Sequence, residues 1–149
     1  MTGILMPHIN RSALVPYSAE QMFALVNDIH AYPEFIPGCT SSRVVSKQGN
    51  ELTAEMAVSK AGISKTFTTR NVITDNQSIV MRLVEGPFRS FAGDWRFTSL
   101  SQDACKVEFE MSFEFKNKLI ELAFGQVFKE MANSMVQAFT KRAKEVYRV

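Results

Sequence analysis

Apolar and polar residues alternate with period two through the middle of the chain, from about residue 39 to residue 116. The clearest run is Val107–Phe115, in which the odd-numbered residues are all apolar and the even-numbered ones are Glu or Ser. Such alternation is typical of a strand with one buried and one solvated face. Turn signals such as Gly49-Asn50 and Asp75-Asn76 separate the runs and favour antiparallel hairpins. With a first strand over Ile9–Val15, the pattern predicts seven antiparallel strands, and we expect the odd-numbered set 107–115 to face a helix.

Helical periodicity flanks this region on both sides. Ser18 and Gln21 form a predicted capping box at the start of a short helix. Pro33 and Pro37 then limit the next segment to a short helical turn between them. Residues 118–147 carry a continuous apolar stripe at helical spacing, which predicts a single helix of roughly 45 Å.

The order of elements predicts one α+β domain over residues 1–149, with residues 1–7 as a disordered extension. We expect a curved, seven-stranded antiparallel sheet that wraps around the long C-terminal helix, with one or two short helices after the first strand. The space between a curled sheet and a helix tends to leave a cavity, and apolar cavities are the usual form of small-molecule sites. No run approaches the ~20 apolar residues of a membrane-spanning helix.

Composition leaves two interpretations of the interior open. The chain has twelve Phe and eight Met but a single Trp, which suits either a large core or a lined apolar cavity. A formal charge of +2 is too balanced for an overall electrostatic nucleic-acid binder, although a local basic patch is compatible with it. Cys39 and Cys105 lack metal-binding or redox spacing, and we expect reduced thiols in a cytoplasmic protein.

The sequence offers little that could perform catalysis. His8 and His30 are its only histidines, and no nucleophile elbow or phosphate-binding glycine loop is present. Glu85 and Asp94 could form a carboxylate pair for proton transfer, but solvated strand ends and turns explain them more simply. We therefore expect a binding protein with no catalytic residues, no metal and no required cofactor.

Several stretches resemble a known family: Arg11–Ser18, Tyr32–Cys39, Glu85–Phe88 followed by Trp95–Phe97, and Phe139–Ala143. They are similar to the bacterial ribosome-association toxins (RatA) and the mitochondrial coenzyme Q-binding proteins, within the START or Bet v 1-like helix-grip superfamily. The resemblance covers nearly the whole chain. Older cyclase or dehydrase labels for this family come from fold analogy, and fold does not fix function.

The resemblance implies two functions. The leading interpretation is a cytoplasmic protein, with a peripheral position at the inner membrane as an option, that holds a ubiquinone-like prenylquinone without transforming it and so supports respiration. The alternative is a translation inhibitor that binds the large ribosomal subunit and blocks its association with the small one.

For the quinone we expect a lid, a facing loop and an inward-facing set, although each member could be ordinary core. These are Tyr32, Pro33, Phe35 and Pro37; Gly86, Pro87 and Phe88; and Trp95, Phe124, Phe128 and Met135. Tyr32 and Trp95 are the sharpest candidates, because each has a polar group that suits a quinone carbonyl.

For the ribosome we expect contacts from two basic groups. These are Lys60, Lys65 and Arg70 near one hairpin, and Lys141, Arg142 and Lys144 near the end of the last helix. Cations at a helix C-terminus are also favoured by the helix dipole, so a structural role would explain the second group equally well.

Overall fold

A computed structural model describes residues 8–60 and 62–147, without the side chain of Lys60, so the predicted extension over residues 1–7 lies outside the described part. The elements are, in order, β1 (His8–Val15), α1 (Ala19–Asn27), the 3-10 helix η1 (Ile29–Glu34), β2 (Cys39–Gln48), β3 (Glu51–Lys60), β4 (Ile63–Thr74), β5 (Ser78–Glu85), β6 (Phe88–Ser101), β7 (Ala104–Phe115), α2 (Lys118–Asn133) and α3 (Met135–Val146).

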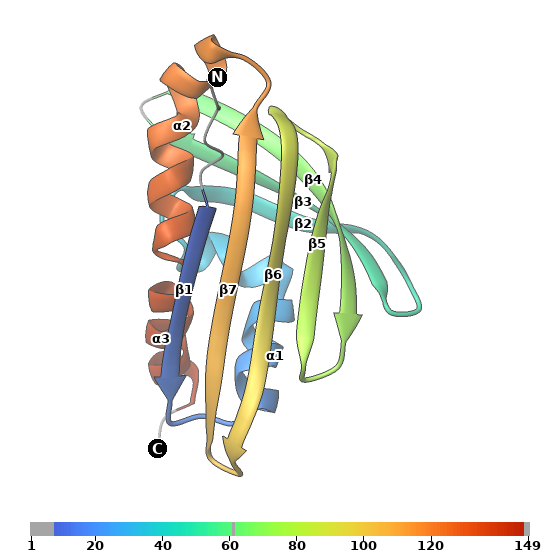
Figure 1. Cartoon of the computed structure of the whole chain (residues 1–149), viewed down its shortest axis with the longest axis vertical. Helices are drawn as coiled ribbons and strands as arrows, with labels where there is room; N and C mark the ends of the chain where they lie inside the picture. Colours follow the sequence, from blue (N-terminus) through green and yellow to red (C-terminus); the bar gives the residue numbers. More distant parts are fainter. Residues whose placement is uncertain (1–7, 61, 148–149) are drawn as a thin grey trace, which may run out of the picture.

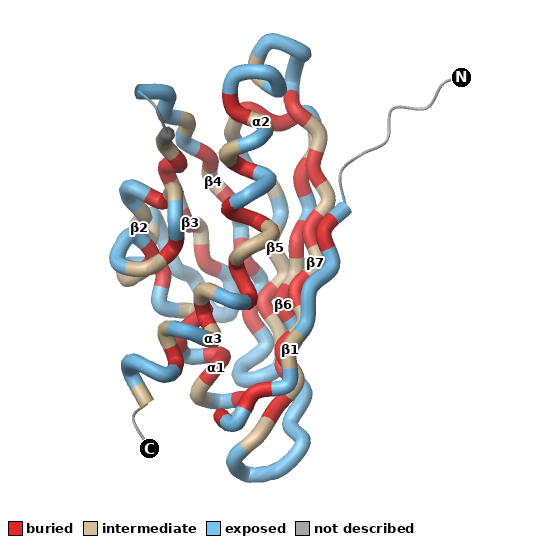
Figure 2. The backbone as a smooth tube through the Cα atoms, turned by 90° about the vertical axis from the view of Figure 1, so that its left-hand side faces the viewer, coloured by how far each residue is buried: buried red, intermediate tan, exposed pale blue. Residues whose placement is uncertain are grey.

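The seven strands form one antiparallel sheet in the order β1-β7-β6-β5-β4-β3-β2. The sheet curves around the helices, and α2 and α3 follow one another beside β1 (Figure 1). Buried residues gather on the sides of the strands and helices that face each other (Figure 2). The predicted α+β helix-grip fold is confirmed.

The alternation in β7 has the predicted phase. Its odd-numbered residues 107–115 are all buried, whereas its even-numbered neighbours are half-buried on the outer face. The strand pairs with β1 on one side and with β6 on the other. Because only one face of β7 touches solvent, buried and half-buried residues alternate along its whole length.

The predicted C-terminal helix is divided in two at Ser134. The Ser134 hydroxyl donates to the Met131 carbonyl at 2.9 Å, and the Asn133 side-chain amide donates to the Lys129 carbonyl at 3.0 Å. Side chains that bond to preceding carbonyls compete with the helical ladder and bend it. The apolar stripe continues across the break, so periodicity alone predicts one helix.

The first helix begins as predicted. Ser18 Oγ accepts a hydrogen bond from the Gln21 backbone N–H at 3.0 Å, and Gln21 Oε1 accepts one from the Ser18 N–H at 2.9 Å. The following helical turn differs from the prediction, because η1 includes Pro33 and begins before it.

Aromatic rings join α2 to the inner face of the sheet. Phe128 is 0% exposed, and its ring centroid lies 4.8–6.4 Å from six other phenylalanine rings. These rings come from β4, β6, β7 and α2: Phe67, Phe88, Phe91, Phe113, Phe115 and Phe124. We call these seven residues the aromatic cluster.

Truncation of Phe128 tests the structural role of this cluster. Phe128→Ala should lower the free energy of unfolding by about 3–5 kcal/mol, because six neighbouring rings cannot all move to fill the space. Leu119→Ala, on an exposed side chain of the same helix, should change it by less than about 0.5 kcal/mol. Urea denaturation measures both. A loss below about 1 kcal/mol for Phe128→Ala would show that the cluster is loosely packed.

Substitution of two glycines by alanine should change the stability of the protein in opposite directions. A Cβ on Gly86 would lie 2.6 Å from Cβ of Phe67, so Gly86→Ala should destabilise by about 1–3 kcal/mol. A Cβ on Gly125, inside α2, would meet its nearest neighbours at 3.5 Å. Gly125→Ala should therefore stabilise by about 0.5–1 kcal/mol through helix propensity. Thermal unfolding measures both changes in stability. If the two variants are both stabilised or both destabilised, this packing is contradicted.

Candidate functional site

A small cavity lies between the inner face of the sheet and the break between α2 and α3. Its volume is about 50 Å³. Met131 and Met135 reach it from the two sides of Ser134. The other residues of its wall come from η1, β3, β4, β5, β6 and β7: Ile29, Tyr32, Ala54, Met56, Phe67, Thr69, Asn71, Met81, Phe91, Trp95 and Met111.

Five of the eight methionines of the chain meet at this wall. Methionine side chains are unbranched and change rotamer easily, so a wall made of them can adapt its shape. Sites for drug-sized molecules have volumes of about 300–1,000 Å³. The cavity is smaller than that, and occupation by such a molecule requires the methionines to rearrange.

Two polar side chains stand in this apolar wall, both on the inner face of β4. Thr69 and Asn71 are 6% and 3% exposed, and the Thr69 hydroxyl donates to Asn71 Oδ1 at 2.9 Å. Among the described residues, the Asn71 amide nitrogen and the indole nitrogen of the buried Trp95 donate to no acceptor. Two hydrogen-bond donors are thus available at the cavity wall.

Sequence reasoning did not identify Thr69 and Asn71. The signal was present, because they share the odd-numbered phase of β4 with the buried Phe67 and Ile73. Polar residues at core positions of a strand need partners or a function, since burial of an unpaired amide costs about 1–3 kcal/mol.

Tyr32 also lies at the cavity wall, but its hydroxyl is already engaged in a hydrogen bond within the protein. This hydroxyl donates to the Val26 carbonyl, and the ring packs edge-on against Phe139 at 5.5 Å. Burial, with smaller effects of Cys39 and Asp28, raises the pKa of Tyr32 far above its ordinary value. Tyr32 therefore stays neutral and presents its ring, rather than its hydroxyl, to the cavity.

The rest of the predicted lid packs on α3 and does not reach the cavity. The Phe35 ring lies 5.1 Å from that of Phe139, and the Arg142 guanidinium stands 5.0 Å above Phe35. Arg142 also pairs with Glu34 at 3.1 Å. Pro33 and Pro37 are exposed beside these contacts.

Three predicted residues of the facing loop and two of the helix lie with the aromatic cluster. Phe88, Phe124 and Phe128 are members of it, and Gly86 is pressed against Phe67. Pro87 is buried, and its carbonyl accepts from the Lys116 N–H at 3.0 Å. Of the predicted ligand-binding set, the structure thus brings Tyr32, Trp95 and Met135 to the cavity.

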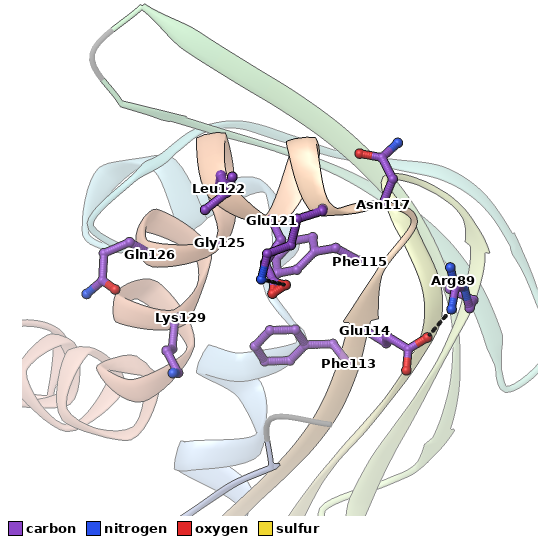
Figure 3. A pocket seen from close by; sticks show the side chains of 11 residues that line it. Arg89, Phe113, Glu114, Phe115, Asn117, Glu121, Leu122, Gly125, Gln126 and Lys129 are labelled. Carbon is purple, nitrogen blue, oxygen red and sulfur yellow. Dashed lines mark ion pairs between the residues drawn. The ribbon is translucent and has the colours of Figure 1, made fainter. Parts of the chain in front are cut away.

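A larger groove, about 690 Å³, opens between the end of β7 and the start of α2. Phe113 and Phe115 point from β7 toward the helix, and Glu114, on the other side of the strand, pairs with Arg89 at 3.1 Å (Figure 3). The remaining wall is formed by α2 and the residue before it: Asn117, Lys118, Glu121, Leu122, Gly125, Gln126 and Lys129. β1 starts opposite Ser112, so in the described chain it leaves this last part of β7 uncovered.

The predicted ribosome contacts fall on two surfaces. Lys141 and Lys144 are exposed on α3, whereas Arg142 is held by Glu34 and Phe35. Arg70 is exposed on β4, directly opposite Arg82 of β5, a cation that sequence reasoning did not identify. Lys65 is half-buried on β4, and the side chain of Lys60 lies outside the described residues.

The described residues contain no group of three His, Cys, Asp or Glu that could hold a metal ion. Asp94 pairs with Arg96 at 3.3 Å, and Glu85 is exposed at the end of β5, so neither carboxylate is at the cavity wall. Cys39 and Cys105 are free and buried, and burial raises the pKa of Cys39 to about 11. No helix in the described part of the chain is long and apolar enough to cross a membrane.

Comparison of the fold with solved structures agrees with the helix-grip architecture. The Zhui aromatase/cyclase of a Streptomyces species superposes with a TM-score of 0.84 over 97% of this chain and 98% of that one, at 16% identity. At this identity the likeness shows the fold alone.

Sequence comparison identifies the family. The family described as polyketide cyclase/dehydrase and lipid transport matches residues 15–140. The ribosome association toxin RatA of Escherichia coli is 66% identical over 97% of this chain and 91% of its own length. The coenzyme Q-binding protein coq10 of Schizosaccharomyces pombe is 28% identical over 89% of this chain and 84% of its own length. The chain belongs to the polyketide cyclase/dehydrase and lipid transport family, and within it to the group formed by the RatA toxins and the coenzyme Q-binding proteins.

Proposed function

We propose that this protein holds an apolar molecule with a carbonyl-bearing ring, of the prenylquinone type, between its sheet and its C-terminal helices, without transforming it. The observation that carries the proposal is the pair of free donors, Asn71 and Trp95, in a wall otherwise made of methionines and aromatic rings. Each donor suits a ring carbonyl, and the methionines can move to admit the ring.

The surroundings of the cavity support this assignment. A prenylquinone head offers carbonyl acceptors but no strong donor, which matches a wall where donors lack acceptors. Its isoprenoid tail needs only apolar contacts, which the methionines and aromatic rings of the cavity wall supply. The name of the coq10 relative and the lipid transport in the family description point the same way. The proposal places the protein in the cytoplasm and at the inner membrane, where prenylquinones dissolve.

We also propose that the protein binds this molecule without catalysing a reaction on it. Its wall contains no carboxylate, histidine or lysine that could transfer a proton to or from a bound ring. Tyr32 is the one ionisable group of the wall within the described chain, and its hydroxyl is bonded to Val26.

Removal of the polar pair tests the quinone site. In the double variant Thr69→Val, Asn71→Leu, both partners of one hydrogen bond are replaced by apolar groups, so stability should change little. Quinone affinity should fall by roughly tenfold, the value of one good hydrogen bond. Trp95 is the single tryptophan and stands at the cavity wall, so quenching of its fluorescence by a short-chain ubiquinone measures binding directly.

Thr66→Val is the matched control for this test, because Thr66 is exposed on the outer face of the same strand. It should leave both stability and quenching unchanged. Absence of saturable quenching in the parent protein, together with absence of prenylquinone in a lipid extract of it, would contradict the proposal.

A second candidate is binding to the large ribosomal subunit, which would block subunit association. Relatives 66% identical to this chain carry the name ribosome association toxin. Lys141 and Lys144 support it in the structure, because they are exposed on α3 and have no ion pair among the described residues. Cations of this kind can meet rRNA phosphates.

Neutralisation of the two lysines tests this candidate while Arg142 keeps its contacts. Lys141→Gln, Lys144→Gln should weaken co-sedimentation with large subunits and lower the slope of log affinity against log salt by roughly 1–2. Arg70→Gln, Arg82→Gln changes the same number of charges on the outer sheet face and serves as the comparison. If only the arginine variant loses binding, the end of α3 is not the contact surface.

A further inference from the structure

The first two turns of α2 carry apolar side chains on the outside of the molecule. Leu119 and Leu122 are 77% and 72% exposed, although Ile120 and Phe124 of the same turns pack on the core. Residues three apart share a helix face, so the two leucines form one patch. Figure 2 shows the start of α2 as an exposed stretch at one end of the molecule. Adjacent exposed leucines of this kind form a contiguous apolar patch, which is the usual mark of an interaction site.

Cations surround this patch. Lys116 and Lys118 precede the leucines and are exposed, and Arg89 and Lys129 stand at the rim of the adjoining groove. Lys118 pairs with Glu121 at 3.7 Å and Arg89 pairs with Glu114 at 3.1 Å. Lys116 and Lys129 have no carboxylate partner among the described residues, so this end keeps a positive excess.

The patch adjoins the large groove, since Leu122 belongs to both. The groove and the cavity also follow one another along the same two elements. On β7, Phe113 lines the groove and Met111 lines the cavity; on α2, Lys129 lines the groove and Met131 lines the cavity. The exposed leucines therefore mark the end of the molecule from which an apolar chain would reach the interior.

We propose that Lys116, Lys118, Leu119 and Leu122, which we call the α2 tip, dock the protein on the surface of an anionic lipid bilayer. Exposed leucines flanked by lysines match the interface of a bilayer, where apolar side chains enter the acyl boundary and ammonium groups meet lipid phosphates. Docking brings the mouth of the groove to the membrane, so that an apolar ligand passes between bilayer and protein without crossing water. This second step rests on the proposed prenylquinone function, whereas the docking itself does not.

Co-sedimentation with lipid vesicles tests the α2 tip. The parent protein should bind vesicles of phosphatidylcholine mixed with phosphatidylglycerol more tightly than vesicles of phosphatidylcholine alone. Leu119→Ser, Leu122→Ser should weaken binding to the mixed vesicles by at least about tenfold. Lys116→Gln, Lys118→Gln should weaken it by roughly tenfold at low salt and have little effect at high salt.

Leu14→Ser is the matched control, because Leu14 is 72% exposed but lies near the end of β1 that is opposite to the start of α2 (Figure 1). It should leave vesicle binding unchanged. Quenching of Trp95 by a short-chain ubiquinone should be the same in the leucine variant as in the parent. Docking and quinone binding are therefore measured separately, and failure of one does not imply failure of the other.

Three results would overturn the proposal. The parent protein could fail to sediment with either kind of vesicle. Leu14→Ser could weaken vesicle binding as much as the α2 tip variant does. Finally, the leucine variant could keep vesicle binding but lose self-association or co-sedimentation with large ribosomal subunits, which would assign the patch to a second copy of this chain or to the ribosome.

Discussion

Two groups of aromatic contacts hold the C-terminal helices inside the curved sheet. The positions of the helix break and of the cavity depend on where these two groups lie. Phe128 of α2 is surrounded by six rings of the aromatic cluster. Phe139 of α3 packs against Tyr32, Phe35 and Trp95, with ring centroids 5.1–5.5 Å away. Ser134 lies between these two contacts, and there the helix breaks and the cavity forms. Rigid packing on both sides thus leaves one adaptable, methionine-lined region in the middle.

This arrangement divides the molecule into parts with different tasks. The aromatic cluster contributes stability, because its rings are buried and fill space without polar groups. The wall around Asn71 and Trp95 holds two donors without an acceptor among the described residues, which fits the proposed binding of a ligand that carries acceptors. The α2 tip exposes leucines that contribute nothing to the core of the described chain. Stability, the proposed ligand binding and the proposed docking should therefore be separable by mutation.

The charged groups show the same division. Arg142 is part of the fold, because it joins α3 to Glu34 and Phe35, whereas Lys141 and Lys144 on the same helix are free to meet a partner. The two proposed activities use different surfaces: the interior and the α2 tip for an apolar ligand and a bilayer, and the end of α3 for rRNA. One domain of this family can thus accommodate both without competition for the same residues.

The sequence by itself determined the elements and their phases. Period-two alternation placed the inward face of β7, the Ser18–Gln21 capping box started α1, and the order of elements specified the helix-grip fold. These features are local, since each depends on residues a few positions apart. Only the tertiary structure decided which apolar residues are core and which line a cavity. Phe128 and Trp95 look alike in the sequence, but one is enclosed by rings that are distant along the chain, while the other faces space left by the helix break. The same holds for the ion pair between Arg142 and Glu34 and for the position of Arg82 opposite Arg70. Each depends on contacts between separate elements, and the periodicity of one segment carries no information about the segment that packs against it.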